Sequence, residues 1–386
     1  MQAVILCGGL GTRLRGAIGK APKALSPIAG RPFLDILIKQ LRKNSFTKFL
    51  LLTGYQAEII EKHFPEAVCC RETQPLGTGG ALLNAWSKLD EEFCLINGDT
   101  FFDIDYALLF NFVRQNDLSV CLALRATPDI QRYGYVALEQ DFKISAFVEK
   151  TALPPDIADG YINGGIYYFQ KKTLAKYQQN YSGTFISLEK EILPELLQRK
   201  MLSGLPLGGK FIDIGVPEDY TRAQTEIPQW LEQKARPALF LDRDNTIIRD
   251  PHGAVRPKLF FYADTLNLVK EYQKKGYLTI MVSNQAGLAK GLFTVRAVEA
   301  INKMVQEKYA AENLKIDQVF YCPYHLDGKI ERYKKYSVSR KPQPGMLLAA
   351  CEQFKINLAQ SLMCGDNKET DRIKLPYLPS KIITRE

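Results

Sequence analysis

Short apolar runs of β-forming residues recur along the whole chain and alternate with stretches of helical pattern. The early runs are Ala3-Val4-Ile5-Leu6, 49–53, 93–96 and 119–124, and the later ones are 238–241, 277–282, 319–321, 361–364 and 381–383. Amphipathic stretches such as 294–311 separate the later runs. This alternation favours α/β domains built on largely parallel sheets.

The length of 386 residues predicts two domains, because one hydrophobic core seldom serves more than about 200 residues. A polar helical stretch over 229–234 leads to Arg236-Pro237, and a new apolar strand begins at Ala238. We therefore predict a first domain over 1–227, a linker over 228–237 and a second domain over 238–386.

Composition indicates which kinds of ligand and which cellular location to expect. The net charge of +9 permits nucleic-acid binding, but no basic motif interleaved with aromatic residues accompanies it, and small anionic substrates explain it equally well. The eight cysteines are scattered without a CxxC pair, which favours reduced thiols. The first apolar run soon reaches glycines, and no run approaches the roughly 18 residues of a membrane helix. We expect a cytoplasmic protein that binds neither nucleic acid nor membrane, and the sequence leaves a homo-oligomer open.

A glycine-rich loop with cations follows the first strand, over Leu6-Cys7-Gly8-Gly9-Leu10-Gly11-Thr12-Arg13, with Pro22-Lys23 downstream. Glycines let backbone amides approach a triphosphate closely, and Arg13 and Lys23 can neutralise its phosphates. The alternative is a purely structural turn, which the paired cations disfavour.

Two aspartates, Asp99 and Asp213, each end an apolar strand, where ligands bind in open α/β sheets. Two such carboxylates can hold Mg2+ between a phosphate and its acceptor. The loop at 74–80, Gln-Pro-Leu-Gly-Thr-Gly-Gly, has the small residues that let a nucleobase lie against the backbone.

Together, GGxGTRL with its downstream PK, LGTGGA, NGDTFFD, VEK, NGG and FIDIGxPEDY resemble the sugar-1-phosphate nucleotidyltransferases, and most of all the heptose 1-phosphate guanylyltransferases. The resemblance covers Met1 to about Ala223 and implies a Rossmann-like mixed sheet, GTP and a heptose phosphate as ligands, and Mg2+ on Asp99 and Asp213. It makes Arg13 and Lys23 catalytic, without a covalent intermediate. The implied nucleotide-binding residues are Leu6, Gly8, Gly9, Gly11, Thr12, Gln74, Leu76, Gly77, Thr78 and Asp99, and the implied sugar-binding residues are Lys150, Asn163 and Gly164.

A second acidic motif, DxDxT, ends the strand at 239–241 with Asp242 and Asp244. Alone, such a motif is commonly a helix cap or an idle acidic patch. Here a strand-end serine, a cationic pair and another strand-end aspartate follow in order, as Ser283, Arg340-Lys341 and Asp366.

This ordered set resembles the haloacid dehalogenase phosphatases, and FLDRDNTI, SNQAGLAKG, CPYH and RKPQPGM resemble the heptose 1,7-bisphosphate 7-phosphatases, with histidinol phosphatases as near relatives. The resemblance covers 238 to about 371 and implies a Rossmannoid domain without a large cap. It implies that Asp242 is the nucleophile and Asp244 the acid and then the base. The further implied roles are phosphoryl binding by Ser283, charge stabilisation by Lys341, substrate orientation by Asn284 and Arg340, and Mg2+ binding by Asp242, Asp244 through its carbonyl, and Asp366.

The sequence departs from this second pattern in three places. Asn245 stands where glycine is usual, and asparagine tolerates left-handed backbone angles. Relatives often bind zinc through a cysteine and histidine and a CxC, but Ser337-Val338-Ser339 replaces the CxC and leaves only Cys322 and His325, so we predict no structural Zn2+. The basic loop 329–335 must then be held by other contacts. The end after Asp371 lacks the expected alanine-rich helix.

The two implied activities are consecutive: removal of the 7-phosphate from heptose 1,7-bisphosphate, then transfer of GMP to the heptose 1-phosphate. Two alternatives remain: the same chemistries on another sugar phosphate or with another nucleotide, and a non-catalytic nucleotide-sugar sensor.

Overall fold

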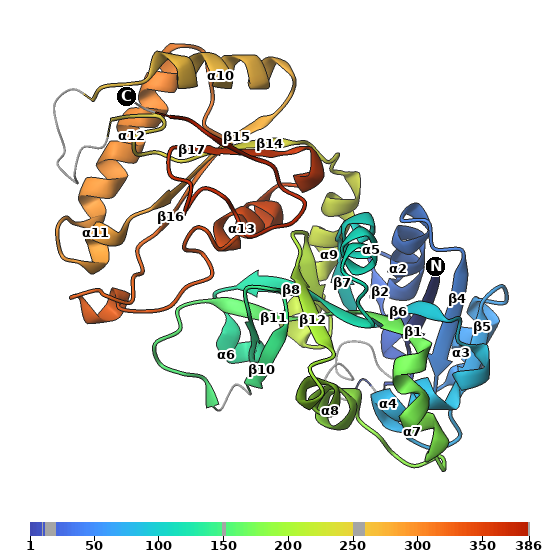
Figure 1. The fold of residues 1–386 in the computed structure, drawn as a ribbon. Helices are drawn as coiled ribbons and strands as arrows, with labels where there is room; N and C mark the ends of the chain where they lie inside the picture. Colours follow the sequence, from blue (N-terminus) through green and yellow to red (C-terminus); the bar gives the residue numbers. More distant parts are fainter. Residues whose placement is uncertain (10, 12–20, 149–151, 250–258, 385–386) are drawn as a thin grey trace. The chain divides into compact units, whose positions relative to one another are not determined.

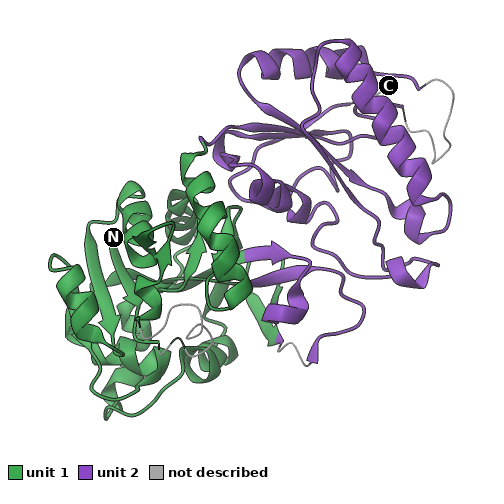
Figure 2. Ribbon diagram, turned by 180° about the vertical axis from the view of Figure 1, so that it is seen from behind, with its two compact units in different colours: residues 1–124, 136–147, 163–233 green, residues 125–135, 148–162, 234–386 purple. Residues whose placement is uncertain are grey.

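The computed structural model describes residues 1–9, 11, 21–148, 152–249 and 259–384. They form two compact units (Figure 2). Unit 1 comprises Met1–Leu124, Val136–Phe147 and Asn163–Gln233, and unit 2 comprises Arg125–Tyr135, Val148–Ile162 and Lys234–Glu386. Two segments of the predicted first domain, 125–135 and 148–162, therefore cluster with unit 2.

A nine-stranded mixed sheet forms the core of unit 1 (Figure 1). Its main path is β10-β9-β11-β6-β1-β4-β5, and β8 joins β11 to β12. β1 is parallel to β4 and β6, whereas β11 is antiparallel to β6. The strands are β1 (Gln2–Leu6), β4 (Lys48–Thr53), β5 (Val68–Arg71), β6 (Glu92–Asn97), β8 (Val120–Thr127), β9 (Tyr135–Leu138), β10 (Ile144–Val148), β11 (Gly160–Gln170) and β12 (Leu202–Pro206). β1 lies between two parallel neighbours, and a strand covered on both faces reads as a continuous apolar run.

The following α-helices belong to unit 1, and each of them except α7 buries apolar side chains. They are α2 (Phe33–Lys43), α3 (Ala57–His63), α4 (Gly77–Asn84), α5 (Tyr106–Gln115), α7 (Ala175–Gln179), α8 (Leu193–Gln198) and α9 (Pro217–Glu232). α9 begins with proline at its first turn and buries Trp230 near its end, so the predicted linker begins inside this helix.

Short 3-10 helices of both units span Lys23–Leu25, Trp86–Lys88, Lys171–Leu174, Glu331–Tyr333 and Leu358–Gln360, and a π-helical turn spans Leu188–Ile192.

Two small sheets complete unit 1. β2 (Pro27–Ile28) pairs with β3 (Arg31–Pro32), and β7 (Thr100–Phe102) pairs antiparallel with β13 (Phe211–Asp213). In the second sheet Asp213 lies opposite Thr100, so chain segments more than 100 residues apart place Asp213 beside Asp99.

A five-stranded parallel sheet, in the order β16-β15-β14-β17-β18, forms the core of unit 2. The strands are β14 (Ala238–Leu241), β15 (Leu278–Asn284), β16 (Gln318–Cys322), β17 (Leu362–Gly365) and β18 (Ser380–Ile382). α10 (Ala263–Lys274) and α12 (Val295–Ala311) lie on one face and α13 (Gly345–Gln353) on the other (Figure 1). Two shorter helices, α6 (Ile130–Tyr133) and α11 (Ala286–Ala289), also belong to this unit.

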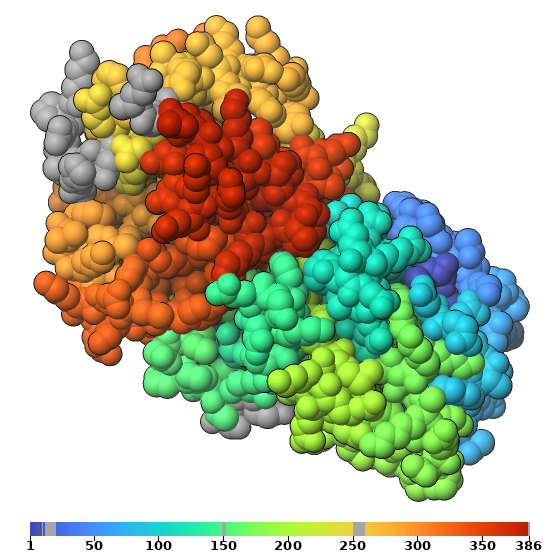
Figure 3. Space-filling model, viewed as in Figure 1, coloured from blue at the N-terminus to red at the C-terminus, as the bar shows by residue number. Residues whose placement is uncertain are grey.

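Within the described residues 372–384, which follow Asp371, there is no helix. Ile373, Leu375 and Leu378 are buried, and β18 then pairs in parallel with β17. In the space-filling view this C-terminal segment, coloured red, forms part of the surface of unit 2 (Figure 3). Among the described residues, no helix has the length and apolar character to cross a bilayer.

Candidate active sites

Unit 1 contains a cavity of about 330 Å³ next to the carboxyl ends of β1 and β6. Seven of the predicted nucleotide-site residues line it: Leu6, Gly8, Gly9, Lys23, Gly77, Thr78 and Asp99. Gly11 adopts a left-handed φ of 58°, which glycine accepts without strain. Thr12 and Arg13 lie outside the described residues.

Two predicted nucleotide-site residues, Gln74 and Leu76, are not among the residues that line this cavity, and both make contacts within the protein. The Gln74 amide donates to the carbonyl of Gly183 at 3.1 Å. Leu76 is buried, and its backbone amide donates to Glu72 Oε2 at 3.1 Å. Both residues therefore shape the loop before α4.

Several lining residues were not predicted from the sequence, and the polar ones are Glu72, Asn97 and Glu189. Burial raises the pKa of the Glu72 carboxyl, and the hydrogen bond from the Leu76 amide offsets only part of this increase. A Cβ on Gly8 would lie 3.0 Å from Glu72 Oε1, so this glycine leaves room for that side chain. Glu189 accepts a hydrogen bond from Thr78 Oγ1 at 2.7 Å. Thr78 alone lies in a recognised motif, so only the folded chain reveals this pair.

The two aspartates predicted to hold a metal lie near each other, and one of them, Asp99, lines the cavity. Burial raises the pKa of the Asp213 carboxyl, and the nearby Asp99 raises it further. Lys23 forms an ion pair with Asp99, and the amide of Gly215 donates to Asp213 Oδ1 at 2.7 Å. Two hard carboxylates so close together suit a divalent cation, which would relieve their repulsion.

Two of the three predicted sugar-binding residues, Asn163 and Gly164, lie on β11. Asn163 is engaged within its own strand, because its Nδ2 donates to the Tyr167 hydroxyl at 2.8 Å and its Oδ1 accepts from the Gly165 amide at 3.0 Å. A Cβ on Gly164 would lie 2.7 Å from the carbonyl oxygen of Ala123, so close packing requires glycine there. Lys150 lies outside the described residues.

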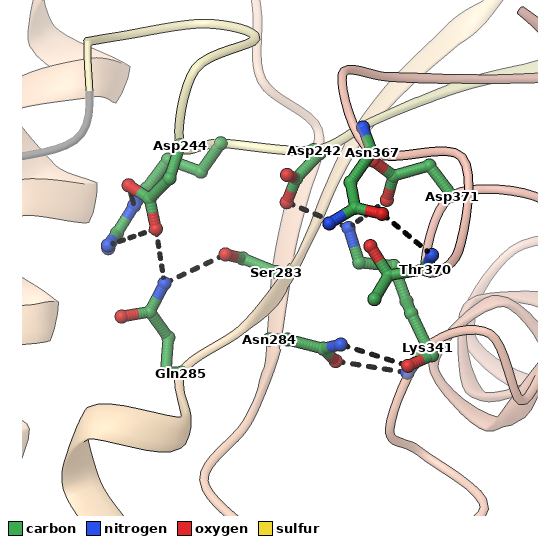
Figure 4. Close-up of polar contacts among 10 residues, drawn as sticks. Asp242, Asp244, Ser283, Asn284, Gln285, Lys341, Asn367, Thr370 and Asp371 are labelled. Carbon is green, nitrogen blue, oxygen red and sulfur yellow. Dashed lines mark hydrogen bonds and ion pairs between the residues drawn. The ribbon is translucent and has the colours of Figure 1, made fainter. Parts of the chain in front are cut away.

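In unit 2 a buried lysine joins two aspartates (Figure 4). Lys341 Nζ lies 2.8 Å from Asp242 Oδ1 and 2.6 Å from Asp371 Oδ1. Burial raises the pKa of the Asp242 carboxyl against the opposing effect of Lys341. Burial alone would lower the pKa of Lys341, but the two aspartates outweigh it and raise that pKa.

Asp366 joins the same group, because Asp242, Asp366 and Asp371 each offer an oxygen within 4.8 Å of the others. This set of hard oxygen donors at the ends of β14 and β17 suits a divalent cation. No role in the site was predicted for Asp371 from the sequence. Its burial and its bond to Lys341 place it inside the cluster.

The side chain of Asp244 points away from Asp242, toward Gln285 (Figure 4). Its carboxylate binds Arg243 through two contacts of 2.8 and 3.0 Å and accepts from Gln285 Nε2 at 2.8 Å. The same Nε2 donates to Ser283 Oγ at 2.8 Å, so Gln285 connects the predicted acid/base to the predicted phosphoryl-binding hydroxyl. Sequence reasoning assigned no role to Gln285, although it stands within the SNQ motif.

Asn284 and Arg340, both predicted to orient the substrate, are bonded to the protein. The Asn284 side chain donates to the Lys341 carbonyl at 2.9 Å and accepts from the Lys341 amide at 3.0 Å. Arg340 Nη1 donates to the Tyr324 carbonyl at 3.4 Å, and burial lowers the pKa of its guanidinium. Asn284 thus fixes the backbone that carries Lys341.

The structure shows the local contacts and conformations at the positions where the sequence departs from the phosphatase pattern. Asn245 adopts a φ of 55°, which confirms the expected left-handed conformation. Cys322 Sγ donates to Ser337 Oγ at 3.7 Å. The basic loop is held by backbone bonds, because the amides of Lys329 and Ile330 donate to the Ala289 carbonyl at 2.7 and 2.9 Å.

Comparisons with known proteins divide the chain in two. The family described as nucleotidyl transferase matches residues 2–229, and the family described as polynucleotide kinase 3 phosphatase matches residues 238–376. The D-glycero-alpha-D-manno-heptose 1-phosphate guanylyltransferase of Campylobacter jejuni is 36% identical over 226 residues, which cover 57% of this chain and 97% of that protein. The D-glycero-beta-D-manno-heptose-1,7-bisphosphate 7-phosphatase of Salmonella typhi is 38% identical over 138 residues, covering 35% of this chain and 73% of that protein.

A solved structure is also similar to the first half. The crystal structure of HddC from Yersinia pseudotuberculosis complexed with GMP-PN has a TM-score of 0.50 and 32% identity, and the match covers 58% of this chain and 99% of that one. The chain therefore belongs to the nucleotidyl transferase family over residues 2–229 and to the polynucleotide kinase 3 phosphatase family over residues 238–376.

Proposed function

We propose that this chain catalyses two consecutive steps toward GDP-heptose. The phosphatase half removes the 7-phosphate of D-glycero-D-manno-heptose 1,7-bisphosphate, and the transferase half then transfers GMP from GTP to the heptose 1-phosphate. One observation carries the proposal: a single chain joins segments similar to enzymes named for these two reactions, and each segment presents a group of strand-end aspartates beside a lysine.

In the transferase, an oxygen of the sugar phosphate attacks the α-phosphorus of GTP, and the bond to the leaving pyrophosphate breaks. Asp99 and Asp213 would hold Mg2+, which offsets negative charge on the phosphates when bound. Lys23, beside Asp99, and Arg13 stabilise the charge of the leaving group. Asn163, Gly164 and Lys150 are proposed to bind the sugar phosphate.

In the phosphatase, which we propose has a haloacid dehalogenase-like fold without a large cap, an oxygen of Asp242 attacks the 7-phosphoryl group. The bond to the sugar oxygen breaks, and Asp244 supplies its proton. Asp244 then takes a proton from the water that hydrolyses the aspartyl phosphate. Asp242, Asp366 and the Asp244 carbonyl would hold Mg2+, which offsets phosphoryl charge when bound. Ser283 and Lys341 contact the transferring group, and Arg340 orients the sugar.

The order of the steps constrains the sugar. The transferase forms a bond to phosphorus and leaves C1 untouched, so both halves must accept the same anomer. The similar transferase is named for the alpha form and the similar phosphatase for the beta form. We propose the alpha anomer for both halves, because the match to the transferase covers almost all of that relative. We further propose a cytoplasmic site of action, domains at 1–227 and 238–386, and no structural zinc.

The test is to incubate the chain with Mg2+, each nucleoside triphosphate in turn, and the alpha or beta anomer of heptose 1,7-bisphosphate. Phosphate release followed by GDP-heptose formation from the alpha anomer and GTP is expected. Phosphate release without any nucleotide-sugar would contradict the transferase half. Turnover of only another nucleotide or sugar phosphate would support the alternative substrates, and no turnover with any substrate would favour a sensor.

A further inference from the structure

Unit 2 buries the carboxylate of Asp159, which stands directly before β11. Its Oδ1 accepts a hydrogen bond from the Val338 amide at 2.6 Å. Its Oδ2 accepts from the hydroxyls of Ser337 at 2.9 Å and Ser339 at 2.5 Å. Burying a carboxylate is costly unless donors surround it. Three consecutive residues are thus arranged around one acidic side chain.

Backbone pairing sets the position of this carboxylate. The Tyr336 amide donates to the Asp156 carbonyl at 2.7 Å, and the Ala158 amide donates to the Tyr336 carbonyl at 2.9 Å. Ile157 and Tyr336 form a parallel bridge through these bonds. The segment 156–159 therefore runs alongside 336–339 in a defined register, and Asp159 cannot shift without breaking it.

The turn at 337–339, which binds Asp159, is followed directly in the chain by the two predicted phosphatase cations, Arg340 and Lys341. The Val338 carbonyl accepts from the Gly345 amide at 2.7 Å at the start of α13, and the Arg340 amide donates to the Ser337 carbonyl at 3.2 Å. A Cβ on Gly345 would lie 2.5 Å from the Val338 carbonyl oxygen, so this side of the turn is closely packed as well. Lys341 is only two residues beyond Ser339.

We propose that Asp159 is a positioning residue for the phosphatase: it fixes the turn that delivers Arg340 and Lys341 to the carboxylate cluster. The inference rests on the proposed phosphatase activity. Asp159 lies within the residues that match the nucleotidyl transferase family, 2–229. The phosphatase half therefore depends on a side chain that the phosphatase match, 238–376, does not contain.

The test compares Asp159→Ala and Asp159→Asn in the full chain. Alanine removes both acceptor atoms and leaves the Val338 amide without its buried acceptor. We expect the phosphatase kcat to fall on the order of 10- to 100-fold, with a smaller change in KM, because displaced cations weaken transition-state stabilisation. Asparagine keeps one acceptor for Val338, and the serine hydroxyls can turn to accept from its amide, so we expect it to restore most of the activity.

Two further variants complete the design. Asp156→Ala removes an exposed carboxylate from the same segment and should behave as the wild type. The double variant Ser337→Ala with Ser339→Ala removes two donors to Asp159 and should lower kcat in the same direction. GMP transfer to heptose 1-phosphate, measured on each sample, should stay within about two-fold of wild type if the chain is correctly folded.

Each outcome bears on the proposal. A phosphatase kcat of Asp159→Ala equal to that of Asp156→Ala would overturn it. Equal loss with alanine and asparagine would also overturn it, because asparagine keeps the acceptor for the Val338 amide. Parallel loss of both activities would overturn it too, because it indicates general misfolding. Release of p-nitrophenol from p-nitrophenyl phosphate is measured alongside. If the wild type hydrolyses only that compound, the heptose assignment fails, whereas the ratio between variants still tests Asp159.

Discussion

At the scale of single residues, the central feature of the phosphatase site is the pairing of the Lys341 ammonium with two carboxylates. One buried ammonium faces two buried carboxylates, those of Asp242 and Asp371. The order of motifs along the sequence predicted Asp242 and Lys341, because each follows a recognisable pattern. It could not predict that Asp371 binds Lys341, or that Gln285 connects Asp244 with Ser283, because these contacts depend on how loops fold back onto the strand ends.

Replacing Lys341 with methionine should therefore cost both stability and activity. The change leaves two carboxylates buried without their cation, and breaking a buried ion pair in this way costs about 3–5 kcal/mol. Urea unfolding of unit 2 measures that loss, and phosphate release should disappear. Lys368→Met, at an exposed position near the same loop, should change stability by less than about 0.5 kcal/mol. Equal stability of the two variants would refute this charge balance.

At the scale of secondary-structure elements, the turn between β6 and β7 links the sheet of unit 1 to its predicted metal site. Apolar runs predicted β1, β4, β6 and β8 of the nine-stranded sheet, and the position of Asp99 after an apolar run predicted its place at the sheet edge. The pairing of β7 with β13 was not predictable, because both strands are only three residues long and join segments distant in sequence.

Gly98 tests this turn, because a Cβ there would lie 2.3 Å from the Leu6 carbonyl oxygen on β1. Gly98→Ala must push β1 and the turn apart, and we expect it to destabilise unit 1 by about 1–3 kcal/mol. GMP transfer should fall as well, since Asp99 follows directly. Gly9→Ala is the control for stability, because a Cβ on Gly9 would meet nothing within 4 Å. Similar thermal unfolding of both variants would show that the turn tolerates the added methyl group.

At the scale of the whole molecule, the chain combines two enzyme families, but the division between the two families along the sequence differs from the division between the two compact units. Residues 125–135 and 148–162 cluster with unit 2, although the family match places them in the transferase. The change from the first strand series to the second predicted two domains. The sequence did not predict this exchange, because no recognisable motif marks the contacts: 156–159 binds 336–339 through backbone pairing and one buried carboxylate, and Arg125 forms an ion pair with Glu352.

If each half of the chain carries its own chemistry, a pair of reciprocal variants will separate the two activities. With heptose 1,7-bisphosphate, Mg2+ and GTP, Asp213→Asn should release phosphate at the wild-type rate and accumulate heptose 1-phosphate without GDP-heptose. Asp242→Asn should release no phosphate, yet convert added heptose 1-phosphate to GDP-heptose at the wild-type rate. Loss of both activities in either variant, or GDP-heptose formed normally by Asp213→Asn, would refute this separation of the two sites.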